Sequence, residues 1–335
     1  MSRICAIFGL MMNKCLLCFS DCSDPYYNLG LEALLLETVK ENECILYLWQ
    51  NQRTVVIGRN QNVWQELKVE QLNKEEGHVA RRYSGGGAVF QDLGNLNFTF
   101  LVHESVYDVD KQLSVILKAL AKLGIHGEKN GRNDLTVENR KFSGNAYYKK
   151  HQQCYHHGTL LVNANMDDLS RYLNVSEEKL QSKGVASVRS RVVNLCEFQP
   201  FLTVEKLKEK LVEAYADVYG RYSLIEPKQL DQQRLDELKS QFTSWDWLYG
   251  RSIQFDHQLK RRFSWGSVDL QLHVDKGLIQ SLNCYSDAMD QDFILALKKQ
   301  LLGCRYTEAD MCLAVPVHAA ADEVKGLIHD SFWRD

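Results

Sequence analysis

The spacing of apolar residues along the chain predicts short strands interspersed with helices. Short apolar runs bounded by polar or turn-forming residues are typical of strands, and they occur at 14–19, 98–102, 135–137 and 159–162. Two more runs, Ile45–Trp49 and Thr54–Ile57, are separated by Asn51-Gln52-Arg53. A polar break of this kind between two apolar runs predicts a β-hairpin.

Helix signals lie between these strands. Asp24 and Pro25 are typical of a helix start and predict a helix over Tyr26–Lys40. Gly124 is a stop signal for a helix over 113–123, and apolar spacing predicts further helices over 166–173 and 204–219. The mixture predicts an α+β fold with mixed β-sheets and flanking helices, because no strand–glycine loop–helix unit of the Rossmann type occurs.

A different block follows the aromatic, turn-like sequence SWDWLYG, residues 244–250. Runs at 263–265, 268–274 and 278–283 alternate like antiparallel strands around an Asp275-Lys276-Gly277 turn, and a helix is predicted over 290–302. We therefore expect a large domain over 1–252 and a small α+β domain over 253–335. The first eleven residues are expected to be an extension.

Composition excludes several classes of protein. The chain has 335 residues, of which 45% are apolar and 25% charged, as in an ordinary globular protein rather than a disordered one. Forty basic and forty-three acidic residues give a formal charge of -3. Because nucleic-acid-binding proteins are typically basic, this charge argues against nucleic-acid binding. No apolar run approaches the roughly 20 residues of a membrane span, so we expect no membrane association.

The ten cysteines are spaced irregularly, unlike a disulfide scaffold. Cys15, Cys18 and Cys22 form C-x2-C-x3-C, but no fourth ligand is nearby and the segment reads as strand core, so we expect neither zinc nor an iron–sulfur cluster. Lys14 interrupts the apolar N-terminal stretch, and no small-x-small cleavage site follows it. A cytoplasmic location is expected.

The most unusual stretch is RRYSGGGAVF, Arg81–Phe90. Three consecutive glycines are poor material for a helix or a central strand, but they let backbone N–H groups turn toward a ligand. The guanidinium groups of Arg81 and Arg82 add fork-shaped positive charge. The combination predicts a phosphate-binding loop in a nucleotide pocket, although not a Walker A loop, because Gly-Lys-Ser/Thr is missing. The alternative is a flexible surface turn with solvated arginines.

Three further segments carry candidate polar groups. Lys141 precedes the small residues of KFSGNA, where its ammonium either lies beside a ligand or is simply exposed. Asn133 and Asp134 form a plain turn or supply oxygen atoms to Mg²⁺. His156 and His157 are adjacent in a predicted strand, so we expect one in a pocket and one pointing outward, and no zinc site.

These motifs, in this order, resemble those of the lipoate–protein ligase A family. The resemblance runs from about Met12 nearly to the C-terminus, including the small second domain. It rests on six segments in register: VVIGRNQNVW (Val55–Trp64), ARRYSGGGAVFQDLGNLNFTF (Ala80–Phe100), GRNDL (Gly131–Leu135), RKFSGNA (Arg140–Ala146), HHGTLL (His156–Leu161) and KGVASVRSRVVNL (Lys183–Leu195).

The resemblance implies the catalytic fold of biotin and lipoate ligases and a reaction in two steps. Lipoate and Mg-ATP give lipoyl-AMP and pyrophosphate, and the lipoyl group then passes to the ε-amine of a lysine on an acceptor. Acceptors in this family are the lipoyl domains of 2-oxoacid dehydrogenase complexes and the glycine cleavage H protein, and octanoate is also accepted. ATP and Mg²⁺ are the implied co-substrate and metal, with no tightly bound organic cofactor. We expect a monomer.

The resemblance also implies roles for residues. Lys141 bridges the carboxyl oxygen of lipoate and the α-phosphate, where a compact charge screens the repulsion between two anions. Contacts to ATP are implied for Arg82, Gly87, Ala88, Val89 and Phe90. Asn133 and Asp134 are candidates for organising Mg²⁺ and phosphate, and Ser84 and His157 for lining the acyl pocket.

Related activities are less compatible with the motifs. The octanoyltransferases share this fold but need no ATP, because a cysteine carries the acyl group as a thioester. At the two places where that cysteine occurs, this chain has Arg132-Asn133-Asp134 and Asn174-Val175-Ser176, and Cys154 and Cys196 are displaced from them. The Gly-Arg-Gly-Arg loop of biotin–protein ligases is missing. A non-enzymatic lipoate-binding protein would have no use for ATP-binding groups, and the implied set of these groups is complete in this chain.

Overall fold

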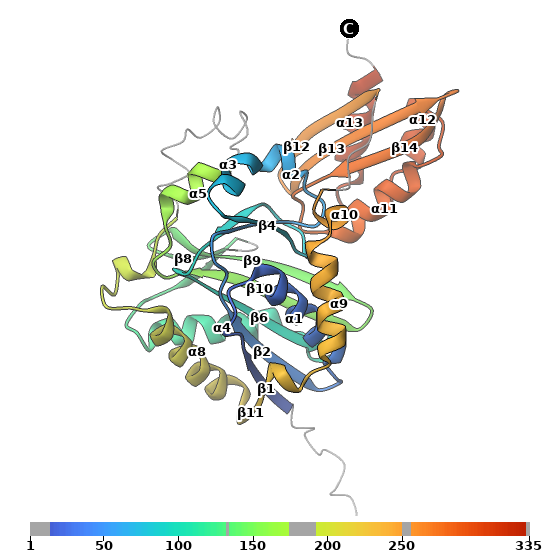
Figure 1. The fold of residues 1–335 in the computed structure, drawn as a ribbon. Coiled ribbons are helices and arrows are strands. Elements are labelled where there is room, and N and C mark those ends of the chain that lie inside the picture. The colour runs from blue at the N-terminus through green and yellow to red at the C-terminus, as the bar shows by residue number, and fades with distance from the viewer. Residues whose placement is uncertain (1–13, 132–133, 174–191, 250–255, 333–335) are drawn as a thin grey trace, which may run out of the picture. The chain divides into compact units, whose positions relative to one another are not determined.

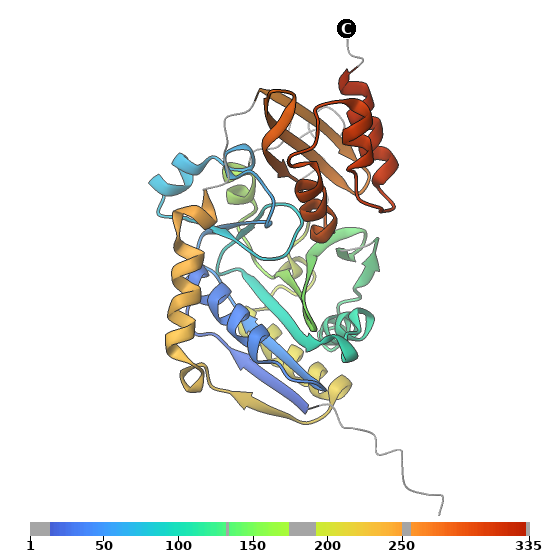
Figure 2. The same cartoon turned by 90° about the vertical axis from the view of Figure 1, so that its right-hand side faces the viewer.

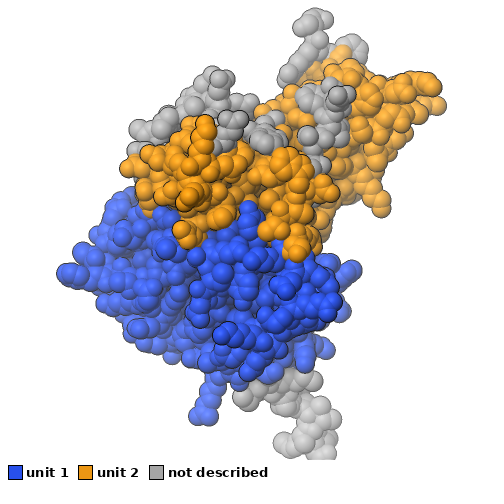
Figure 3. Space-filling model, viewed as in Figure 1, with its two compact units in different colours: residues 1–51, 92–164, 184–239 blue, residues 52–91, 165–183, 240–335 orange. Residues whose placement is uncertain are grey.

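A computed structural model of the protein describes residues 14–131, 134–173, 192–249 and 256–332. The contacts within it define two compact units, coloured separately in Figure 3. Unit 1 comprises Met1–Asn51, Asp92–Ala164 and Gly184–Lys239, and unit 2 comprises Gln52–Gln91, Asn165–Lys183 and Ser240–Asp335. The two units are described separately below. Mixed sheets and helices confirm the α+β class.

Unit 1 is built on a mixed eight-stranded sheet with the strand order β11-β1-β2-β6-β10-β9-β8-β7. β1 runs parallel to β2 and β11, and the remaining neighbours that follow β2 in this order are antiparallel. Its strands are β1 (Lys14–Phe19), β2 (Glu43–Trp49), β6 (Asn95–His103), β7 (Glu128–Asn130), β8 (Asp134–Val137), β9 (Arg140–Lys150), β10 (Gln153–Leu161) and β11 (Tyr222–Ile225).

Helix α1 (Pro25–Thr38) covers one face of this sheet. It begins as predicted, because Pro25 is its first residue and Asp24 Oδ1 accepts a hydrogen bond from the N–H of Tyr26 at 2.9 Å. Its other side packs on α9 (Gln232–Thr243) (Figures 1 and 2). Gly30 permits this approach, since a Cβ there would lie 3.3 Å from the backbone nitrogen of Lys239. The helix is therefore buried on every side over residues 28–36.

The opposite face of the sheet is covered by α4 (Val109–Ala121) and α8 (Val204–Tyr219). The bounds of α8 are those predicted, and α4 begins four residues before the predicted start because Asp108 caps it by accepting from the N–H of Lys111. Burial of the apolar faces of these helices forms the large core of unit 1, which includes Leu46, Leu48, Phe98, Phe100, Ile116, Leu120, Leu207 and Leu211.

Unit 2 contains two three-stranded sheets, with the orders β4-β3-β5 and β12-β13-β14. Its strands are β3 (Thr54–Ile57), β4 (His78–Arg81), β5 (Val89–Gln91), β12 (His257–Phe263), β13 (Gly266–Asp275) and β14 (Leu278–Tyr285). Its helices are α2 (Val63–Glu66), α3 (Val69–Lys74), α5 (Met166–Tyr172), α10 (Trp245–Leu248), α11 (Gln291–Leu301), α12 (Glu308–Leu313) and α13 (Ala321–Phe332).

The hairpin predicted for Ile45–Trp49 and Thr54–Ile57 is wrong, although both strands exist. β2 pairs on its two sides with β1 and β6, so its edges are occupied. β3 pairs instead with β4 and β5 in another sheet. The polar break at 51–53 marks a change of direction, but a local turn signal cannot state which strands become partners.

The C-terminal hairpin is confirmed. β13 and β14 are joined across Lys276 and Gly277, whose φ angles of 50° and 74° suit a tight turn that matches the twist of the strands. The first strand of this sheet lies earlier than predicted, at His257–Phe263 instead of 263–265. The expected domain boundary near residue 252 and the expected extension over residues 1–11 lie outside the described residues and stay predictions.

Candidate functional site

Lys141 lies beside a β-bulge that decides which face of the sheet its side chain occupies. Thr136 of β8 pairs with Lys141, and Asp134 pairs with Gly144, so two steps along β8 correspond to three along β9. Because one residue of β9 is additional, Lys141 and Gly144 both face the side of Asp134. This is the face covered by α1, whereas Phe142 is buried in the core on the opposite face.

An ion pair then fixes the lysine ammonium. Its Nζ lies 2.7 Å from Asp134 Oδ1, and the two side chains are 38% and 42% exposed. The lysine chain passes over Gly144, where a Cβ would lie 3.0 Å from Nζ. On the other side of β9, the carbonyl of Lys141 accepts from the N–H of Val193 at 2.9 Å. The result is a half-exposed cation in a defined position.

A buried histidine–carboxylate pair lies on the same face of the sheet. His157 pairs with Ala146, two residues after Gly144, and its Nδ1 lies 2.9 Å from Glu32 Oε1. The side chains of His157 and Glu32 are 9% and 3% exposed. Thr99 Oγ1 donates to the same Glu32 oxygen at 2.7 Å and accepts from the indole nitrogen of Trp49 at 3.1 Å. The acceptor in the pair holds the imidazole in one orientation.

Glu32 was not foreseen from the sequence. The usable signal is a single acidic residue inside the apolar segment LGLEALLL of α1. A helix that is buried on every side has no exposed face for a carboxylate, so the side chain must find a polar partner inside the protein.

His156 occupies the opposite face and is completely buried, so the expectation that one of the two histidines points outward is wrong. Helices cover both faces of the sheet, and the His156 ring packs edge-on against Phe98 and stacks on Tyr147. Its two ring nitrogens lie 3.1 Å from Gln112 Oε1 and 2.9 Å from Asn145 Oδ1. Burial lowers the pKa of His156 to about 3, with a smaller contribution from the neighbouring His157, because a charged imidazole is disfavoured there.

The two arginines of the glycine-rich segment belong to unit 2, and Arg81 differs from expectation. Its guanidinium is 1% exposed, so it is not a solvent-facing phosphate ligand in this structure. It donates to five backbone carbonyls at 2.7–3.2 Å, those of Gly58, Arg59, Gln61, Trp247 and Leu248. Arg81 therefore ties the segment after β3 to α10.

Arg82 shapes the glycine loop, residues 84–87, from its buried side. Its buried guanidinium donates to the carbonyls of Gly85 and Gly87 at 2.7 and 2.8 Å, and to Ser84 Oγ at 3.0 Å. The C=O and N–H of one trans peptide point in opposite directions, so the N–H groups that follow these two carbonyls, including that of Ala88, face away from Arg82. Ser84 is fully buried, its hydroxyl on the guanidinium.

The loop crosses the end of β3 at close range. A Cβ on Gly58 would lie 2.2 Å from the carbonyl oxygen of Gly86, so only glycine fits at this crossing. Along the segment that follows, Gly87 is exposed, Ala88 and Val89 are partly exposed, and Phe90 is buried. The accessible part of the predicted nucleotide segment is therefore residues 87 to 89.

Two of the predicted segments lie partly outside the described residues. Asn133 lies outside the described residues, as does most of the predicted segment Lys183–Leu195. Within the ranges that the structure covers, three or more His, Cys, Asp or Glu side chains do not gather in an arrangement able to hold a metal. No helix in these ranges is long and apolar enough to cross a membrane.

Comparisons with known proteins agree with this fold. Residues 24–216 match the model of the lipoyl protein ligase A/B catalytic domain, and residues 252–325 match that of the bacterial lipoate protein ligase C-terminus. The chain is similar to lipoate-protein ligase A of Psychrobacter cryohalolentis, at 40% identity over 301 residues that cover 87% of this chain and 89% of that protein.

Solved structures show the same similarity. The P. falciparum protein LipL1, in complex with lipoate, is 30% identical with a TM-score of 0.83, and the match covers 94% of this chain and 99% of that one. A lipoate-protein ligase A bound with ATP shares the fold, at 23% identity and a TM-score of 0.60, with 71% of this chain and 98% of that chain covered.

Fold and motifs together define a ligase with the catalytic fold of the lipoyl protein ligases. The chain belongs to the lipoate–protein ligase A family, as its sequence motifs predict.

The low pKa of His156 predicts a pH-dependent stability. In the unfolded chain this imidazole has a pKa of about 6.5, so its contribution is fully present above pH 6.5 and is lost as the pH falls from there toward about 3. The loss amounts to about 1.4 kcal/mol per pH unit. Urea unfolding at pH 7.5, 6 and 5 should show the protein losing more stability on acidification than the variant His156→Gln. Parallel losses in both proteins would contradict this.

The position of Lys141 over Gly144 predicts the effect of Gly144→Ala. The added methyl group meets the flexible end of the lysine side chain rather than backbone, so the fold should survive while the ammonium moves. We expect a melting temperature close to that of the parent and a ligase rate reduced on the order of 10-fold, because reacting groups tolerate little displacement. A control variant, Gly326→Ala, adds the same methyl group where nothing lies within 4 Å. Full activity of Gly144→Ala would show that the lysine position is not critical.

Proposed function

We propose that this chain activates lipoate with ATP and transfers the lipoyl group to a lysine of an acceptor protein. In the first step the lipoate carboxylate attacks the α-phosphate of ATP, so that lipoyl-AMP forms and pyrophosphate leaves. In the second step the lysine ε-amine attacks the carbonyl of the adenylate, so that an amide forms and AMP leaves. The observation that carries the proposal is the half-exposed ammonium of Lys141, fixed on one face of the sheet by a bulge and an ion pair.

Lys141 suits the first step for an electrostatic reason. Two anions must approach each other, and a fixed positive charge between them stabilises the transition state more than the separated substrates. An ammonium on a flexible stem, with three donors, can interact with a carboxylate oxygen and a phosphate oxygen at once. Asp134 keeps Nζ in place before the substrates bind.

The glycine loop suits the nucleotide. The buried guanidinium of Arg82 supplies positive charge behind the loop and turns the carbonyls of Gly85 and Gly87 toward itself. Of the two N–H groups that face the other way, that of Gly86 donates to the carbonyl of Ala288 at 3.3 Å, and we propose that of Ala88 as the donor to a phosphate oxygen. We propose that the accessible backbone from 87 to 89 contacts ATP, that Phe90 anchors this segment, and that Arg82 acts on ATP chiefly through the loop.

The α1 face of unit 1 suits the acyl chain of lipoate. His157 is held by Glu32 there, among Thr99 and Trp49, and it shares this face with Lys141. We propose that this face receives lipoate and, as a second substrate, octanoate, since P. falciparum LipL1 was solved in complex with lipoate. The hydroxyl of Ser84 is occupied by Arg82, and its role in the acyl pocket stays a prediction.

Mg²⁺ fits one carboxylate of the candidate site. The ion usually binds proteins through one or two carboxylates and keeps its other positions for phosphate oxygens and water. Asp134, with a side chain 42% exposed, would hold it together with the phosphates of ATP. The ion would neutralise charge on the phosphates during the first step.

We propose lipoyl domains of 2-oxoacid dehydrogenase complexes and the glycine cleavage H protein as acceptors, and a monomer in the cytoplasm as the working form.

The alternative activity, octanoyl transfer through a cysteine thioester, has less support. A thioester-forming cysteine needs a lowered pKa. Burial instead raises the pKa of Cys154, which is 2% exposed, and that of Cys196. Both thiols are therefore unsuited to act as the nucleophile.

Lipoate-dependent exchange of labelled pyrophosphate into ATP measures the first step and tests the proposal. We expect Lys141→Ala to retain its fold, because the side chain is half-exposed, and to lose exchange by on the order of 10²-fold or more. Lys129→Ala is the matched control, since Lys129 is an ion-paired lysine of the same sheet, 2.6 Å from Asp110. Near-normal exchange by Lys141→Ala would refute the assignment, and absence of exchange by the parent protein would refute the proposed function.

The pair of Glu32 and His157 predicts a selective effect on the acyl substrate. Glu32→Gln keeps the size of the side chain but removes the charge that orients the imidazole. We expect KM for lipoate to rise about ten-fold or more, the size of one hydrogen bond to a charged group, with KM for ATP unchanged. Glu43→Gln, at a buried carboxylate that pairs with Lys14, is the control. Unaltered lipoate kinetics in Glu32→Gln would separate this pair from the acyl site.

A further inference from the structure

The accessible nucleotide segment of unit 2 depends on a side chain that cannot itself touch ATP. Phe90 is 3% exposed and lies in the small core behind the β4-β3-β5 sheet. Side chains alternate along β5, so that Phe90 turns into this core and the backbone before it runs through the partly exposed Ala88 and Val89 to the exposed Gly87. The place of that backbone is therefore set by what packs against Phe90.

The ring of Tyr172 packs against it. Tyr172 is the last residue of α5, far away in the sequence, and it is completely buried in the same small core. The centres of the Tyr172 and Phe90 rings lie 5.5 Å apart at an interplanar angle of 37°, a tilted contact that aromatic pairs favour. The N–H of Lys68 donates to the carbonyl of Tyr172 at 3.0 Å and joins α5 to the start of α3.

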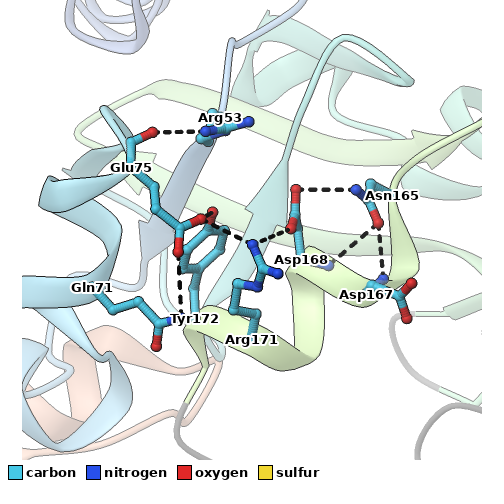
Figure 4. A network of polar contacts seen from close by, with 8 residues as sticks. All are labelled: Arg53, Gln71, Glu75, Asn165, Asp167, Asp168, Arg171 and Tyr172. Carbon is cyan, nitrogen blue, oxygen red and sulfur yellow. Dashed lines mark hydrogen bonds and ion pairs between the residues drawn. The ribbon is translucent and has the colours of Figure 1, made fainter.

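The Tyr172 hydroxyl, at the polar end of an otherwise buried ring, is held by Glu75 (Figure 4). Its oxygen lies 2.5 Å from Glu75 Oε2, and the same carboxylate oxygen accepts from Arg171 at 3.0 Å. Arg53 donates to the backbone carbonyl of Glu75 at 2.7 Å. The hydrogen bond from the Tyr172 hydroxyl lowers the pKa of Glu75, and burial raises the pKa of Tyr172. At neutral pH the contact therefore joins a phenol donor to a charged acceptor, the stronger kind of hydrogen bond.

This contact braces both strands that frame the glycine loop. Glu75 ends α3 and lies three residues before β4, which leads into Arg82. Tyr172 supports β5, where the loop ends. β3 lies between these two strands, and the loop crosses it with no room for a Cβ at Gly58. A shift of β5 relative to β4 must therefore move the loop.

We infer that Tyr172, held by Glu75, is a positioning residue for the nucleotide end of the reaction: it fixes Phe90 and thereby the loop backbone that faces the phosphates. The inference rests on the proposed function and extends it to a residue outside the predicted motifs. According to this inference, loss of the phenol–carboxylate contact raises KM for ATP more than KM for lipoate, because Lys141 and the pair of His157 and Glu32 belong to unit 1.

The test is steady-state pyrophosphate exchange with Tyr172→Phe, which keeps the ring and removes the hydroxyl, and with Glu75→Gln, which removes the charged acceptor. We expect each variant to raise KM for ATP about five-fold, with KM for lipoate changed less than two-fold. Tyr215→Phe is the matched control, because Tyr215 is equally buried in unit 1 and its hydroxyl donates to the Cys44 carbonyl at 2.7 Å. Glu213→Gln controls for Glu75→Gln, since Glu213 accepts from Lys210 at 2.7 Å.

The outcomes separate the inference from the proposed function. An unchanged KM for ATP in both variants, with only a lower melting temperature, would show that the contact is merely structural. An equal rise in Tyr215→Phe would show a general effect of destabilisation. If Tyr172→Phe does not fold, Glu75→Gln tests the same contact without changing the Tyr172 side chain. The parent protein must show lipoate-dependent exchange throughout; if it does not, the proposed function fails, independently of Tyr172.

Discussion

One additional residue in strand β9 determines where the central positive charge of unit 1 lies. Without the bulge, Lys141 and Gly144 would face opposite sides of the sheet, because side chains alternate along a strand. With it, the ammonium lies on the α1 face, within 2.7 Å of Asp134 and over a residue without a side chain. The polar groups of His157 and Glu32 share that face, and the apolar core fills the other.

Positive charge is used in two different ways in this protein. The lysine is half-exposed and retains freedom to meet a substrate, as an ammonium on a flexible stem can. The guanidinium groups of Arg81 and Arg82 are buried and donate hydrogen bonds to backbone carbonyls. A planar group with five fixed donors is well suited to hold several carbonyls at once. Arg82 therefore determines the shape of the glycine loop, and Arg81 joins the segment after β3 to α10.

Local signals predicted the elements well and their partners poorly. The cap at Asp24, the helix over 204–219 and the Lys276-Gly277 turn follow from residue chemistry that acts within a few positions, and all three are confirmed. The partners of β2 and β3, and the bulge that turns Lys141, depend on strands distant in the sequence. The burial of Arg81 was unpredictable for the same reason: its acceptors at residues 247 and 248 are brought near only by the tertiary fold.

The buried pair of Glu32 and His157 is explained by selectivity better than by stability. Removing a carboxylate from water costs several kcal/mol, and an apolar pair of similar volume is often at least as stable. The surrounding helix already supplies Leu31, Ala33 and Leu34, all buried, so the core does not need a charge at this position. What the carboxylate adds is direction: with Thr99 it fixes the imidazole of His157 on the face that carries Lys141. In the proposed function this face receives the acyl chain, and a fixed polar group there would help to distinguish one chain from others, because apolar packing alone separates chains of similar shape only weakly.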